Sequence, residues 1–305
     1  MIASLGFQTV TDAVALGAIY ALMAVGIGLV FGVLRLVNFA YGQLIMAGAY
    51  TLAFTSSWPA GGSIALCVGV VVTLSLLMEL FVFRPLRNQS QAVMLVTTFA
   101  IAFLLQAVAQ IVDLRNDQLG EVVFSWITTL NQSITIGGVD IRKVTIVAVV
   151  VAIVALLLIT LLLNKTTIGL HTRAAASDFR TARLLGVRAN RVITFAVVLS
   201  GVLAAAVAVL FVAGTDPGPL VTPDFALRQT IVVLVGVVVG GIDRLWTATL
   251  GGFAIGFASG IINALLPTEN SVYLPSVLFG LVIVVLLLRP AGLFAWGRRG
   301  QVERV

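Results

Sequence analysis

The sequence has 305 residues, of which 60% are hydrophobic and only 10% charged, and its formal net charge is +6. This composition excludes an ordinary water-soluble domain, in which about 25% of the residues are charged, because too few polar side chains would remain to cover the core. The positive charge does not indicate binding to nucleic acid, since the lysines and arginines stand in short loops between apolar blocks.

The apolar blocks are the main structural signal. Most of them contain about 17–24 residues, enough to cross a hydrocarbon layer ~30 Å thick as helices. The alternating segments of ~10 residues that form a membrane β-barrel are absent. The sequence therefore predicts an all-α, polytopic transmembrane helical bundle in a single domain, residues 1–305, with about nine spans (eight to ten). The nine expected spans are 10–33, 40–56, 63–83, 91–112, 142–164, 191–213, 226–240, 247–266 and 272–289.

The distribution of basic residues predicts the orientation. With nine spans, 14 of the 18 lysines and arginines fall on one side of the membrane and the other four on the opposite side. Cytoplasmic loops carry the excess of basic residues, so we expect the N-terminus outside and the C-terminus in the cytoplasm. The short second block, 40–56, could instead be re-entrant, and an even number of spans would break this arrangement.

Small residues recur at helical spacing in the first and eighth spans. Because lipid gives no hydrophobic drive for helix association, such faces let helix backbones approach closely. We interpret both stripes as helix-packing faces. Their members are Gly17, Ala21, Ala24 and Gly28 in the first span and Gly252, Gly256 and Gly260 in the eighth.

Polar residues interrupt the apolar sequence at 32–44 and in the fourth span. Asn38, Tyr41 and Gln43 stand in the first of these, while Thr98 and Gln106 lie on a polar stripe with four-residue spacing. Polar groups at membrane depth must meet protein, water or substrate. We predict that these five residues line a translocation pathway; the alternatives are an ordinary cytoplasmic turn at 32–44 and structural hydrogen bonds between helices in the fourth span.

Two loops are longer than a turn. The external stretch of about 113–141 is long enough for a small surface structure, whereas the cytoplasmic stretch of about 165–190 is basic. Within the latter, 174–185 is predicted to form an amphipathic helix that Gly186 terminates. Such a helix could lie on anionic lipid or dock on a cytoplasmic partner.

Four segments, in order, resemble the permeases of branched-chain amino acid ABC importers of the LivH type. They are GAIYALMAVGIGLVFGVLRLVNFAYGQLIMAGAY (17–50), FRPLR (83–87), GLHTRAAASDFRTARLLGVRANRVI (169–193), and VVVGGIDRLWTATLGGFAIG (237–256) with the terminal RPAGLF (289–294). The resemblance covers essentially the whole chain. It departs from the family at Tyr41 and Gln43, where relatives carry histidine and an acidic residue, and again at Asp243, Arg244 and Trp246.

The resemblance implies the fold, the partners and a role for the basic loop. The fold would be the ABC importer permease type, and the loop 169–193 would dock a cytoplasmic ATPase. The residues expected at that contact are Arg173, Phe179, Ala182, Leu185 and Gly186. The other implied partners are a second, related permease subunit and an extracytoplasmic substrate-binding protein, besides membrane lipid.

The expected function is that of the membrane-spanning permease subunit of an ATP-driven importer for branched-chain or related amino acids, in a bacterial plasma membrane. No G-x-x-x-x-G-K-[ST] phosphate loop is present, so this subunit would not be an enzyme itself. No cofactor or metal is expected. The alternatives are an importer of urea, amides or other small solutes, and a secondary transporter or channel. An intramembrane enzyme is disfavoured because the one histidine, His171, lies in the basic loop.

Overall fold

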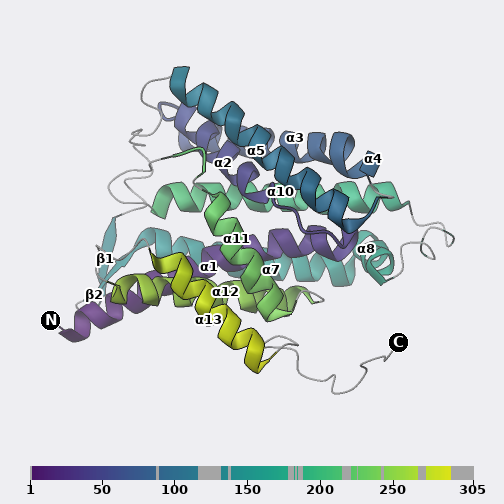
Figure 1. Cartoon of the computed structure of the whole chain (residues 1–305). Helices are drawn as coiled ribbons and strands as arrows, with labels where there is room; N and C mark the ends of the chain where they lie inside the picture. Colours follow the sequence, from purple (N-terminus) through teal and green to yellow (C-terminus); the bar gives the residue numbers. More distant parts are fainter. Residues whose placement is uncertain are drawn as a thin grey trace.

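The chain forms a bundle of long helices that run roughly side by side. The computed structural model describes residues 2–86, 89–115, 132–136, 139–177, 182, 184, 188–214, 221–224, 226–241, 244–266 and 273–289. In Figure 1, helices α4 and α8 lie at one end of the bundle, and the N-terminus and a small β-hairpin lie at the other.

The helices follow the predicted spans in order. Their bounds are α1 (Ile2–Leu34), α2 (Tyr41–Phe54), α3 (Ala60–Met78) continuing through the π-helix η1 (Glu79–Phe83) into α4 (Arg84–Leu86), α5 (Gln91–Arg115), α7 (Lys143–Lys165), α8 (Thr167–Ser177), α10 (Ala189–Gly214), α11 (Leu227–Gly240), α12 (Leu245–Leu265) and α13 (Leu274–Leu288). Six of them are long and apolar enough to cross a membrane: α1, the α3–α4 run, α5, α7, α10 and α12. Helices α2, α11 and α13 are shorter, with 14, 14 and 15 residues. The prediction of a helical, polytopic membrane protein is confirmed.

Within the described residues, the β structure is a two-stranded hairpin. Strands β1 (Ser133–Ile136) and β2 (Val139–Arg142) pair antiparallel, with Ser133 opposite Arg142. They belong to the predicted external loop of 113–141, whereas residues 116–131 lie outside the described part. The hairpin leads directly into α7, and the ammonium of Lys143 donates a hydrogen bond of 2.9 Å to the side-chain oxygen of Gln132.

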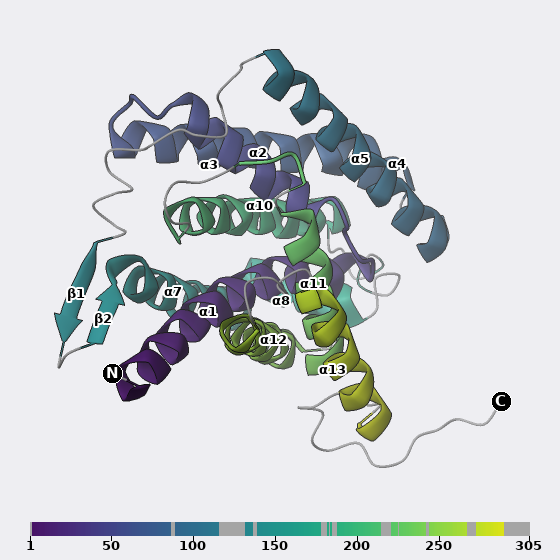
Figure 2. The same ribbon diagram turned by 60° about the vertical axis from the view of Figure 1, so that its left-hand side comes forward.

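Helix α1 is the centre of the bundle. It packs most extensively on α12 and next on α10, and it also contacts α7 and α11. Figure 2 shows α1 surrounded by these helices, with α5 and α13 on the outside. Large apolar side chains of α5, α7 and α13 point away from the protein, including Phe103, Leu158 and Leu287. Such a surface suits contact with lipid rather than water.

The two predicted small-residue stripes lie against each other at the α1–α12 contact. A Cβ added at Gly256 would stand 2.8 Å from the Cβ of Tyr20 and 2.9 Å from the Cα of Gly17. At Gly252 it would stand 2.5 Å from the Cβ of Ala24. Gly260 approaches Ala13 in the same way, and Gly28 faces Leu245. At Gly252, Gly256 and Gly260 the nearest atoms include backbone, so the two helices can approach this closely only with glycine at these three positions.

We expect Gly256→Leu to destabilise the protein by about 1–3 kcal/mol, because the added side chain must push α1 and α12 apart. The matched control is Gly280→Leu in α13, where an added Cβ meets nothing within 4 Å. Thermal unfolding of both variants in detergent measures the difference. A loss of similar size in both variants would show that this close approach does not limit stability.

Candidate functional site

A short non-helical segment separates α1 from α2. The N–H of Arg35 still donates to the carbonyl of Phe31 at 2.8 Å, but Arg35 then adopts φ +54°, which ends the helix. Residues 35–40 are not helical. The carbonyl oxygen of Arg35 accepts a hydrogen bond of 3.1 Å from the side-chain amide of Gln91 in α5. Within the polar interruption at 32–44, residues 35–40 therefore form an irregular connection between two helices, and a hydrogen bond from α5 fixes it.

Asn38 and Thr98 stabilise this connection. The side-chain oxygen of Asn38, which is buried, accepts the backbone N–H of Ala40 at 3.1 Å, a local bond that prepares the start of α2. The hydroxyl of Thr98 donates to the carbonyl of Leu95 at 2.9 Å and lies 3.5 Å from the carbonyl oxygen of Val37. Both residues thus have structural partners at the place where the sequence predicts a pathway.

Tyr41 and Gln43 differ from these two residues. Both are fully buried (0% exposed), yet the hydroxyl of Tyr41 and both amide atoms of Gln43 have no hydrogen-bond partner in the described part of the chain. Leaving a buried polar group unpaired costs about 1–3 kcal/mol. Buried polar groups are normally paired with protein or with ordered water, so these three atoms are exceptions within the described part of the chain.

Helices α1, α10 and α11 enclose the first turn of α2. The hydroxyl of Tyr41 lies against Gly26 of α1, where a Cβ would overlap it. Ser200 of α10 donates to the carbonyl of Gly26 at 2.9 Å. On the other side, a Cβ at Gly42 would stand 2.5 Å from the hydroxyl oxygen of Thr230 in α11. The sequence analysis missed Gly26, Ser200 and Thr230; the available signal was the rarity of hydroxyl side chains in these two apolar helices.

Gln106 lies apart from the other predicted pathway residues. It stands eight positions after Thr98 on α5, about 12 Å along the helix axis at 1.5 Å per residue. Its side-chain oxygen has no partner in the described part of the chain. Asn38, Tyr41, Gln43 and Thr98 therefore gather at the non-helical segment and the start of α2, while Gln106 extends the polar face along α5.

The basic loop begins with a capped helix, and its predicted start was wrong. Helix α8 begins at Thr167, seven residues before the predicted start at Ala174. The hydroxyl of Thr166 accepts the N–H of Gly169 at 3.0 Å, which is an N-terminal cap. A Cβ at Gly169 would overlap the carbonyl oxygens of Leu162 and Leu163, so glycine allows the sharp turn from α7. The prediction placed the helix from its pattern of charged and apolar residues and did not consider Thr166 as a cap.

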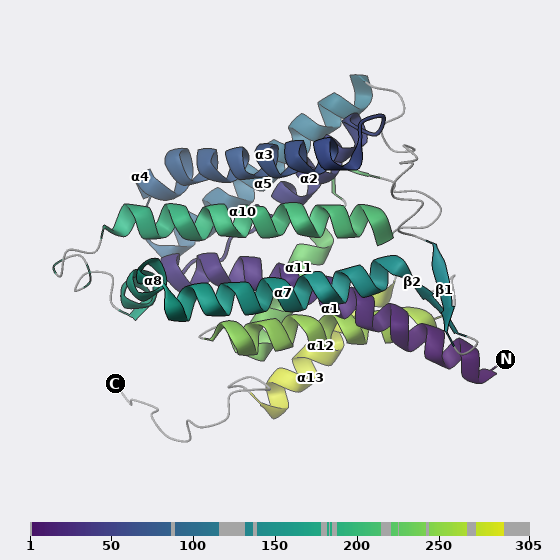
Figure 3. The ribbon, with the colours of Figure 1, turned by 180° about the vertical axis from the view of Figure 1, so that it is seen from behind.

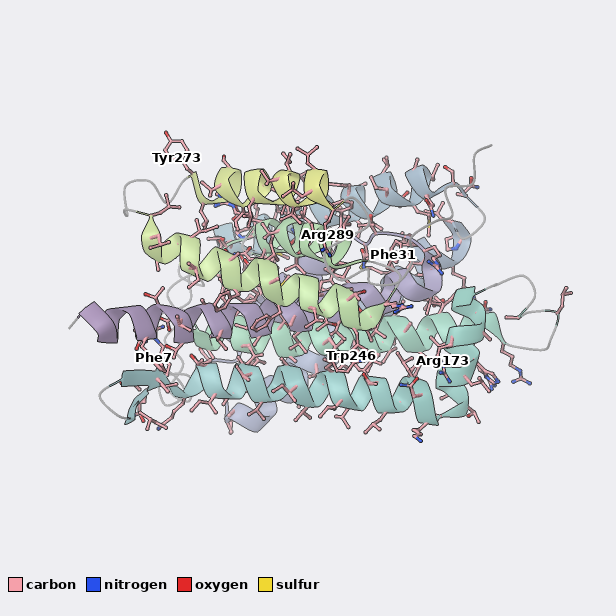
Figure 4. All side chains as sticks on the ribbon, turned by 90° about the horizontal axis from the view of Figure 1, so that it is seen from below. Phe7, Phe31, Arg173, Trp246, Tyr273 and Arg289 are labelled. Atoms are coloured by element: carbon pink, nitrogen blue, oxygen red, sulfur yellow. The ribbon has the colours of Figure 1, made fainter. Side chains whose placement is uncertain are left out.

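The predicted ATPase-contact residues are only partly described. Arg173 is exposed at the end of the bundle opposite Phe7 (Figure 4), and its guanidinium donates to Asn164 at 3.2 Å. Ala182 is buried, at 4% exposure, whereas Leu184 is 85% exposed. Phe179, Leu185 and Gly186 lie outside the described residues. Leu184, which the sequence analysis did not select, is the most exposed large apolar side chain among the described residues of this loop.

Comparison with known proteins decides the family. Residues 9–287 match the family described as the permease component of branched-chain amino acid transport systems. The chain belongs to this family. The resemblance stated from the four sequence segments is confirmed.

Several curated relatives align over nearly the whole permease. The high-affinity branched-chain amino acid transport system permease LivH of Salmonella typhimurium is 28% identical over 312 residues, which cover 98% of this chain and 97% of the relative. BraD of Pseudomonas aeruginosa, with the same described role, is 28% identical over 310 residues with the same coverage. A probable LivH of Methanocaldococcus jannaschii is 25% identical over 291 residues, covering 89% of this chain and 87% of that one. No solved structure gives a significant match.

Proposed function

We propose that this permease forms the membrane pathway of an ATP-driven importer for branched-chain or related amino acids. The alignment with LivH and BraD over 98% of the chain carries the proposal, because those proteins are named as permeases of high-affinity branched-chain amino acid transport systems. The unpaired polar atoms of Tyr41 and Gln43 support it, since they mark a buried place that needs water or a solute.

Energy and selectivity come from partner proteins in this proposal. A cytoplasmic ATPase contacts the α8 end of the bundle, and a second, related permease completes the pathway. A substrate-binding protein delivers the solute from outside. The sequence contains no phosphate-binding G-x-x-x-x-G-K-[ST] motif, so ATP hydrolysis is assigned to the separate ATPase.

The wall at the start of α2 is neutral. Tyr41 and Gln43 offer a hydroxyl and an amide, and the nearby Ser200 and Thr230 offer further hydroxyls. Because these groups form hydrogen bonds without a charge, they suit a solute whose apolar side chain supplies most of the discrimination. The same neutrality is compatible with urea or an amide, which the test below separates from an amino acid.

The substrate class is tested with the assembled transporter in proteoliposomes. We expect uptake of labelled leucine, and unlabelled isoleucine or valine should compete with it, whereas urea and acetamide should not. A binding protein prepared from the same system is included because it delivers the substrate. Uptake of urea or acetamide without uptake of leucine would replace the proposed substrate class.

The orientation places α8 in the cytoplasm and the β-hairpin outside, because 14 of the 18 basic residues then lie inside. We expect a membrane-impermeant thiol reagent to label Ser133→Cys in intact cells and to label His171→Cys only after permeabilisation. Both positions are exposed, and the one native cysteine, Cys67, is buried, which keeps the background low. The reverse pattern of labelling would invert the topology.

A further inference from the structure

A groove of about 820 Å³ opens beside α8, away from the start of α2. It lies between the η1–α4 end of α3, the first turn of α8 and the N-terminal part of α10. Figure 3 shows the ends of α4, α8 and α10 gathered at one end of the bundle. Its volume is within the range of about 300–1,000 Å³ that is typical of small-molecule sites.

The groove has a basic mouth. Arg84, Arg188 and Arg191 line it and are exposed, and His171 of α8 lies beside them. Among the described residues that line the groove, one carboxylate stands against these three guanidinium groups, that of Glu79, which is only 2% exposed. The accessible charge at the mouth is therefore positive, and it favours an anionic group over a neutral or cationic one.

The floor and walls of the groove are apolar. Leu76 and Leu80 come from the α3–η1 run, and Phe195 and Val198 come from α10. Leu80 is 46% exposed and its neighbour Phe81 74%, so this wall belongs to the apolar exterior of the bundle. A ligand that fits both parts carries an anionic head and apolar chains.

The shape of this wall follows from Pro85. Proline has no N–H to donate to the carbonyl four residues earlier, and its ring displaces that carbonyl. The helix responds by widening, so that the N–H of Arg84 bonds to the carbonyl of Glu79, five residues back. This π-turn places Glu79 and Arg84 at the groove, and such turns are frequent at functional sites.

We propose that the groove binds the headgroup of an anionic phospholipid from the cytoplasmic leaflet. The arginines bind the phosphate, and the acyl chains lie along Leu80 and Phe195. The source is lipid rather than a protein partner, because the apolar wall continues onto a surface that faces hydrocarbon. The proposal rests on the proposed orientation, in which α8 is cytoplasmic.

The test measures lipid bound to the purified transporter complex. Native mass spectrometry compares dioleoylphosphatidylglycerol with dioleoylphosphatidylcholine, which share their acyl chains. We expect the wild type to retain dioleoylphosphatidylglycerol in preference to dioleoylphosphatidylcholine. In Arg188→Gln with Arg191→Gln this preference should fall about tenfold, because each basic residue near the headgroup contributes to anionic lipid binding. The charge-matched control is Arg244→Gln with Arg289→Gln, both exposed and outside the groove.

Four results would overturn the proposal. Equal retention of both lipids by the wild type would contradict the proposal. An equal fall in the preference for the anionic lipid in the two double variants would also contradict it. Displacement of the lipid by excess inorganic phosphate would make the groove a free-anion site. Loss of the lipid when the ATPase binds would assign the groove to that partner. If the double variant fails to assemble, Arg84→Gln alone provides the same comparison. The assay measures lipid and not uptake, so its failure is distinct from a failure of the transport proposal.

Discussion

Replacing Leu184 by glutamate is expected to weaken the binding of the cytoplasmic ATPase to this permease by about 30-fold, equivalent to about 2 kcal/mol. Leu184 is 85% exposed in the basic loop. A large apolar side chain held in water gains free energy when a partner covers it, and a carboxylate at the same place must be desolvated instead. Co-purification of the ATPase with the permease, together with uptake by the assembled transporter, measures the effect.

The matched control is Leu265→Glu, the same substitution at the far end of α12, where the leucine is 77% exposed. It should leave ATPase binding unchanged. Unchanged ATPase binding in Leu184→Glu would show that the loop contacts lipid rather than a partner. Ala182 is a poorer probe than the sequence suggested, because at 4% exposure a bulky side chain there would disturb the packing of the permease itself.

Gln43→Leu is expected to lower the rate of uptake at least tenfold without lowering stability. The amide of Gln43 is fully buried and neither of its polar atoms has a partner among the residues that the structure describes, so leucine removes a desolvation cost of about 1–3 kcal/mol. Thermal stability should therefore stay equal or rise. Uptake should fall because a solute or water in the pathway loses a hydrogen-bonding group of its wall.

The two readouts separate a pathway role from a packing role. Gln110→Leu on α5, where the side chain is exposed, is the matched control and should change neither uptake nor assembly. A Gln43→Leu transporter that is more stable and still takes up leucine at the normal rate would show that Gln43 does not line the pathway. A change in which solutes compete would extend the role of Gln43 from conduction to selectivity.

The sequence predicted the helices and their packing faces better than the site. Long apolar blocks and the breaks between them are local signals, and each expected span coincides with a helix or helical run of the described chain. The stripes with Gly17 and Gly256 could be located because a helical face repeats along one segment. The structure was needed to show that the two stripes pack against each other, because neither segment carries a local signal for the helix that it contacts.

Other features depend on contacts between distant segments. The hydroxyl of Tyr41 packs on Gly26, so that α2 contacts α1. Thr230 approaches Gly42, so that α11 contacts α2. Gly236, Gly240 and Gly251, which bring α11 and α12 into backbone contact, were likewise not selected. The start of α8 was missed for a simpler reason, because the cap is one threonine hydroxyl that resembles any other polar residue.

Uptake by proteoliposomes, compared with and without the ATPase subunits, tests the central proposal most directly. The assembled transporter, with its binding protein outside and ATP inside, should accumulate leucine against a concentration gradient. Omitting ATP, replacing it with a non-hydrolysable analogue, or omitting the ATPase subunits should abolish accumulation. If this chain accumulated leucine without the ATPase, driven by a proton or sodium gradient, it would be a secondary transporter and the proposed ATP-driven function would be wrong.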